Sequence, residues 1–107
     1  MSATFDAPSP IISRLASIEN DLAQRQNVLE TAARAWFIAK RDREKEYAIE
    51  YMRAEGPVEA RKAQAIRATS HIGVTEEAEY EALRAVVRVL ETRASIGQSL
   101  LRSQGRV

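Results

Sequence analysis

The sequence contains no cysteine and a single histidine, which excludes several kinds of chemistry. Without cysteine there are no disulfide bonds, thiolate nucleophiles or cysteine-based metal sites, a composition typical of reducing compartments. The Glu-x-x-His motif of di-iron helical bundles needs a glutamate three residues before the histidine. His71 has Ala68 at that position instead. We therefore expect no metal site and no other cofactor.

Proline and glycine, which interrupt helices, number only three and four among 107 residues. Arginine, glutamate and alanine are frequent instead, and these residues favour helix. No apolar run approaches the roughly 20 residues that span a bilayer, and residues 1–10 lack the basic and apolar regions of a signal peptide. We expect an all-α protein that is soluble, cytoplasmic and not associated with a membrane.

Neither sign of charge is in excess, because 16 basic residues accompany 15 acidic ones and the formal net charge is +1. Binding to nucleic acid would therefore need a local basic patch. Such a patch lies toward the middle of the chain, although the alternative there is a solvated helix face whose charges compensate one another. The residues predicted to contact nucleic acid or a protein partner are Lys40, Arg41, Arg43, Lys45, Arg61, Lys62 and Arg67.

The only strong break between two long helical stretches is the sequence Ala-Glu-Gly-Pro at 54–57. Gly56 suits a left-handed helix cap and Pro57 suits the first turn of a helix, so both are predicted as the hairpin turn. Ser9 and Pro10 resemble a helix start, and Asp6 is the alternative cap. We predict a flexible tail at 1–10, a helical hairpin at 11–103 (helix 11–54, turn 55–57, helix 58–103) and a tail at 104–107.

Each stretch carries one apolar stripe at helical spacing. Steps of eleven residues in the first predict a nearly straight seam, and alternating steps of three and four in the second form a heptad pattern. At 70–75 glycine and β-branched residues lower helix propensity. Because the spacing passes through Gly73 unchanged, we favour one continuous helix, kinked there, over a true break. The stripes are Ile11, Leu15, Ile18, Leu22, Leu29, Ala33, Trp36, Tyr47 and Tyr51, and then Ile66, Thr69, Gly73, Glu76, Tyr80, Leu83, Val87, Leu90, Ala94, Gly97 and Leu101.

Folding the chain at Gly56 brings the two stripes together. Facing residues of an antiparallel hairpin have position numbers with a constant sum, and several apolar pairs share one sum whose midpoint is position 56. Large residues tend to meet small ones, as close packing prefers, and Trp36 falls near Gly73, so we expect the indole to fill the space beside the glycine. The pairs are Ile11 with Leu101, Leu15 with Gly97, Ile18 with Ala94, Leu22 with Leu90 and Leu29 with Leu83.

A second apolar row in the C-terminal half widens the stripe beyond what one facing helix covers. A long antiparallel two-helix, coiled-coil-like hairpin has little interior, so we expect a homodimer that forms a four-helix bundle, a higher homo-oligomer, or docking on a protein partner. The alternative is a monomeric hairpin with scattered surface aliphatics. The predicted oligomer interface is Val86, Val89, Ile96 and Leu100.

No residue pattern typical of an active site is present. The chain lacks a glycine-flanked serine, a Gly-rich phosphate loop and a dinucleotide fingerprint. Paired carboxylates such as Glu46 and Glu50 lie one helical turn apart, where they are normally solvated. Tyr47 and Tyr51 have the spacing to stack on bases, or to close the end of the core. We predict that the protein is not an enzyme.

The segments AWFIAKRDR (35–43), AEGPVEARKA (54–63) and LETRASIGQSL (90–100) together resemble small helical proteins carried by actinobacterial bacteriophages. The resemblance covers most of residues 15–100. It implies a phage accessory protein of DNA replication or recombination, in the host cytoplasm, and it identifies no binding residues. We therefore expect a self-associating helical adaptor that contacts a recombination protein or DNA. The alternatives are a scaffolding component of virion assembly and an inhibitor of a host protein.

Overall fold

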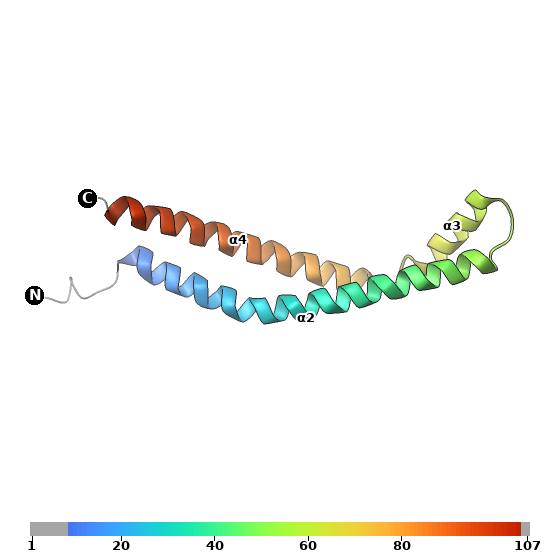
Figure 1. Ribbon diagram of the computed structural model, residues 1–107, viewed down its shortest axis with the longest axis horizontal. Coiled ribbons are helices and arrows are strands. Elements are labelled where there is room, and N and C mark those ends of the chain that lie inside the picture. The colour runs from blue at the N-terminus through green and yellow to red at the C-terminus, as the bar shows by residue number, and fades with distance from the viewer. Residues whose placement is uncertain (1–8, 106–107) are drawn as a thin grey trace, which may run out of the picture. The chain divides into compact units, whose positions relative to one another are not determined.

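The computed structural model describes residues 9–105, and every regular element in that range is a helix. The helices are α2 (Pro10–Arg53), α3 (Val58–Thr69) and α4 (Val74–Gly105) (Figure 1). The predicted all-α class is confirmed for these residues. The chain divides into two compact units, unit 1 (Met1–Val28 with Leu83–Val107) and unit 2 (Leu29–Ala82), and both α2 and α4 contribute to each.

The first helix begins at a serine cap. The backbone N–H of Ile12 donates to Ser9 Oγ over 3.2 Å, and the N–H of Ser13 donates to the Ser9 carbonyl oxygen over 3.0 Å. The first bond satisfies a donor that a helix start leaves free, and the second is the first backbone hydrogen bond of the helix. The predicted tails lie mostly outside the described residues, at 1–8 and 106–107. Residues 104–105, expected in the C-terminal tail, instead continue α4.

In unit 1 the first part of α2 packs antiparallel against the last part of α4 (Figure 1). A Cβ built on Gly97 would lie 2.7 Å from Leu15 Cδ2, so the glycine is what lets the leucine approach α4. This contact confirms the predicted pair of Leu15 with Gly97. The residues of three other predicted pairs lie in the buried cluster of unit 1 or pack against it, namely Ile11 and Leu101, Ile18 and Ala94, and Leu22 and Leu90.

The core of unit 1 is shallow. Its buried side chains, Leu15, Ile18, Leu90 and Ala94, each retain 8–9% of their exposure. Two helices enclose only the line along which they touch, and a unit with so little interior gains little stability from burial. The sides of that line remain open to solvent or to another molecule.

In unit 2 the chain turns between α2 and α3 at residues 54–57. Gly56 adopts φ +105°, in the region that favours glycine. Pro57 is the N-cap of α3, with φ −62°, and its carbonyl oxygen accepts from the N–H of Arg61 over 3.0 Å. Gly56 therefore provides the positive-φ conformation that the turn requires, and Pro57 begins the next helix.

Between α3 and α4 the chain makes a turn at 70–73. The continuous helix that we favoured across 58–103 is therefore wrong, and the alternative of a true break is correct. Heptad spacing counts residues but does not report backbone conformation. Gly73 has φ +82°, outside the right-handed helical region. Its carbonyl oxygen accepts from the N–H of Glu77 over 2.9 Å, so this glycine both ends the turn and starts α4.

The break also changes which side chains α3 buries. Of the residues expected on the apolar stripe, Thr69 is buried at 3% exposure but Ile66 is 55% exposed. Ala65, which was not expected there, is 0% exposed and takes its place. The Thr69 hydroxyl donates to the Ala65 carbonyl oxygen over 2.8 Å, which satisfies a polar group that burial would otherwise leave unpaired. The face of α3 cannot be extrapolated from α4, because the turn resets the helical phase.

Trp36 fills the space beside Gly73, as expected from the pairing of the stripes. Its side chain is buried. A Cβ on Gly73 would lie 3.0 Å from Trp36 Cζ3 and 3.3 Å from Ala39 Cβ. Close by in the sequence, the rings of Phe37 and Tyr80 lie 5.8 Å apart and tilted, which ties α2 to the start of α4 within unit 2.

Replacing Gly97 with leucine should lower the free energy of unfolding by about 1–3 kcal/mol, because the new side chain overpacks against Leu15. Urea unfolding followed by circular dichroism measures the change. Ser95→Leu, at an exposed position of the same helix, is the matched control and should change stability by about 0.5 kcal/mol or less. Combining Leu15→Ala with Gly97→Leu exchanges volume across the contact and should recover part of the loss. Strictly additive effects would contradict this pairing.

Gly73→Ala should cost more stability than Gly56→Ala. Both glycines have positive φ, +82° and +105°, so each substitution strains the backbone by about 1–2 kcal/mol. Only at position 73 does the new methyl also meet an aromatic ring, because at Gly56 the nearest atom is Ala60 Cβ at 3.7 Å. Urea unfolding gives the free energies, and fluorescence of Trp36, the one tryptophan, reports repacking. Equal losses of stability in the two variants, with unchanged Trp36 emission, would contradict the conclusion that the indole packs against Gly73.

Candidate interaction surfaces

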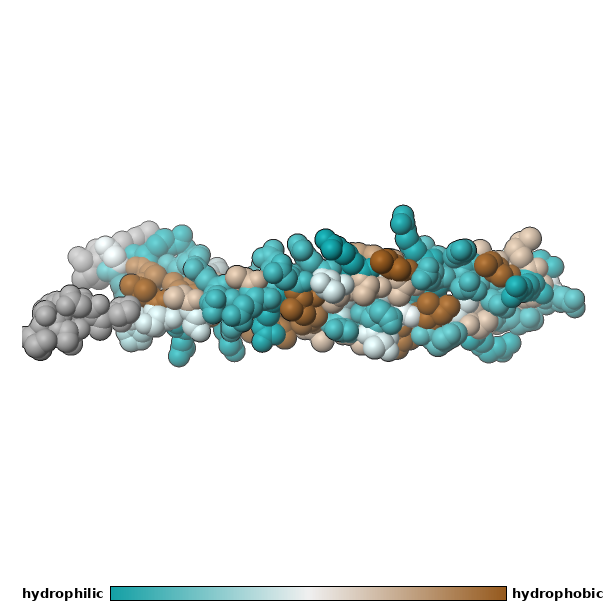
Figure 2. Space-filling view, turned by 90° about the horizontal axis from the view of Figure 1, so that it is seen from below, coloured by the Kyte–Doolittle hydropathy of each residue, from teal (hydrophilic) through white to brown (hydrophobic). Residues whose placement is uncertain are grey.

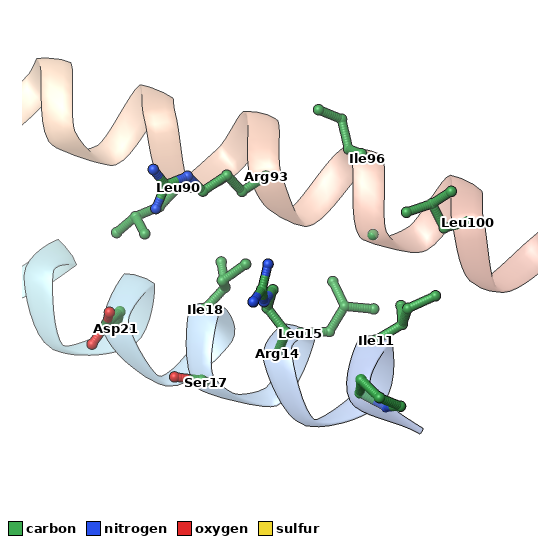
Figure 3. Close-up of a pocket in the computed structure, with 12 residues that line it drawn as sticks. Ile11, Arg14, Leu15, Ser17, Ile18, Asp21, Leu90, Arg93, Ile96 and Leu100 are labelled. Atoms are coloured by element: carbon green, nitrogen blue, oxygen red, sulfur yellow. The ribbon is translucent and has the colours of Figure 1, made fainter. Parts of the chain in front are cut away.

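Unit 1 has an open groove of about 820 Å³ beside the line where α2 meets α4. Core side chains form its floor, and there Ile18 and Leu90 point toward each other from the two helices (Figure 3). The residues of each rim come one position before the apolar residues by which their helix faces the other helix. One position is a rotation of about 100° around a helix, and because the helices are antiparallel this rotation turns both rims to the same side of the pair. The rims are Arg14, Ser17 and Asp21 on α2, and Arg93, Ile96 and Leu100 on α4.

The predicted interface row lies on one side of α4, and half of it borders this groove. Val86, Val89, Ile96 and Leu100 are 39%, 50%, 57% and 50% exposed. Their spacings of three, seven and four residues keep them on a single stripe, which Arg93 interrupts between Val89 and Ile96. Ile96 points away from α2 (Figure 3), so it is available to a molecule that approaches the groove face. The structure thus brings the four residues together on one surface.

The opposite side of α4 in unit 1 is polar. Its exposed positions, each one residue after the core row, are Glu91, Ser95, Gln98 and Arg102. The two sides of α4 therefore differ, since Ile96 and Leu100 border the groove and polar side chains occupy the other side. Figure 2 shows that apolar residues form separate patches among hydrophilic ones on the face that it presents.

Charges of both signs border the groove. Arg14 and Asp21 come from α2, and Arg93 interrupts the aliphatic row on α4. Asp21 is half-buried and Arg93 is exposed. Within residues 9–105, neither side chain forms an ion pair. An incoming surface can therefore pair with both an acid and a base at this site.

Sequence reasoning missed the α2 rim. Arg14, Ser17 and Asp21 are polar, so they are absent from the apolar stripe on which the prediction depended. The sequence could still have identified these three residues, because each comes one position before a residue of the apolar stripe. The row Val86, Val89, Ile96 and Leu100 stands in the same relation to its own core row, and this shared displacement places both rows on one side.

Some of the predicted basic contact residues lie against aromatic rings within unit 2. The Arg43 guanidinium lies over the Trp36 ring, 5.2 Å from its centroid, and that of Arg61 lies over Tyr51 at 6.0 Å. Arg61 Nε is buried without a hydrogen-bond partner among the described residues. Cation–π contacts of this kind hold a guanidinium against the protein. These two arginines therefore support the packing of unit 2.

The other five predicted contact residues of unit 2 have different surroundings. Lys62 Nζ lies 3.6 Å from Glu59 Oε1, in an ion pair on the surface of α3. Lys45 and Arg67 are exposed. Lys40 and Arg41 do lie together, beside a shallow depression of about 300 Å³. That depression is lined by Phe37, Ile38, Lys40, Arg41 and Glu44, so it combines apolar surface with both signs of charge.

Tyr47 and Tyr51 stack on each other, with ring centroids 6.4 Å apart and planes inclined by 22°. Both side chains are half-buried, and Arg61 covers Tyr51. Rings that already stack on each other and carry a guanidinium have less face available for a base. The geometry favours the interpretation that they close the apolar end of unit 2.

The one histidine and the acidic side chains are the candidate metal ligands among the described residues. His71 is exposed, in the turn between α3 and α4. Across residues 9–105, no group of three or more histidine or carboxylate side chains is arranged to hold a metal ion. Among the helices of this range, none combines the length and the apolar character needed to cross a bilayer.

Comparison with protein-family models, with curated proteins and with solved structures finds no significant match to this chain.

Proposed function

We propose that this protein is a non-enzymatic helical adaptor that self-associates through the groove side of unit 1. The observation that carries the proposal is the row Val86, Val89, Ile96 and Leu100, which lies exposed on one stripe beside an open groove. Exposed aliphatic stripes at heptad spacing are the surfaces by which helices pack on other helices. Four-helix bundles are the usual product when two helix pairs meet in this way.

The energetics support a contact on this side. Covering a half-exposed valine, isoleucine or leucine contributes about 1 kcal/mol, and each copy brings four such side chains. The shallow core of unit 1 gains at the same time, because Leu15, Ile18 and Leu90 line the floor of the groove that the contact would cover. Association therefore stabilises both the interface and the helix pair beneath it.

Direct binding of nucleic acid is the weaker candidate. A phosphate-binding surface needs several cations that point outward together. Here Arg43 and Arg61 lie on aromatic rings and Lys62 lies beside Glu59. Lys40 and Arg41 line one depression together with the acidic Glu44. The arrangement favours a protein partner over DNA.

A role in phage DNA replication or recombination, in the host cytoplasm, rests on the resemblance of the sequence and stays a prediction. Scaffolding in virion assembly and inhibition of a host protein use the same kind of surface. These three roles differ in the partner, and capture of partners by a tagged protein distinguishes them. The groove-side variant below is the control for that experiment, because a partner that uses this surface should be lost with it.

The double substitution Val89→Glu with Ile96→Glu should reduce the mass in solution to that of a monomer, because carboxylates would be buried in an apolar contact. Light scattering after size-exclusion chromatography measures the mass. The matched control is Ser95→Glu with Gln98→Glu, which adds the same charge to the polar side of α4 and should leave the mass unchanged. A native protein that is already monomeric at high concentration would contradict self-association.

DNA should not be retarded strongly by the native protein in a mobility-shift experiment, even at low salt. Counterion release would give direct binding through several cations a steep salt dependence. The charge-reversed variant Lys40→Glu with Arg41→Glu tests the remaining basic pair. Salt-sensitive retardation by the native protein that this variant loses would contradict the preference for a protein partner.

A further inference from the structure

We draw no further inference here: the strongest candidate, the open apolar groove beside the line where α2 meets α4 in unit 1, carries none, because nothing in the structure shows what covers it.

Discussion

The close approach of α2 to α4 at Gly97 is the contact on which unit 1 depends. Gly97 has no Cβ, so Leu15 can pack closely against it. A Cβ at position 97 would lie only 2.7 Å from Leu15 Cδ2. Helices that approach this closely exclude water from a single line of leucine, isoleucine and alanine side chains. The same closeness leaves the groove beside that line uncovered. The interaction that stabilises the helix pair thus also creates the surface that we propose for self-association.

In unit 2 a large side chain also packs against a glycine, but there the glycine interrupts the helix. Trp36 packs against Gly73, which adopts φ +82° and separates α3 from α4. A continuous helix would place an ordinary helical backbone at this position. The turn changes the direction of the chain, and α3 buries Ala65 and Thr69 on a face separate from that of α4. Large side chains against glycine therefore define both units, and only in unit 2 does the glycine interrupt a helix.

The charged residues divide into those that support packing and those that remain open to a partner. Arg43 and Arg61 cover the rings of Trp36 and Tyr51, so a count of basic residues overstates the surface available to phosphate. Asp21 and Arg93 stand at the rims of an apolar groove. This difference is why a protein partner is the better proposal.

The sequence by itself determined the helical class, the turn at Gly56 and Pro57, and the packing of Leu15 on Gly97 in unit 1. Each follows from local propensity or from periodicity, which a single sequence records. Only the tertiary structure decided that Gly73 leaves the helix and that Arg43 and Arg61 lie on aromatic rings. It also decided that polar residues of α2 border the same groove as the aliphatic row of α4. These features depend on which side chains meet across the fold, and spacing along one chain does not contain that information.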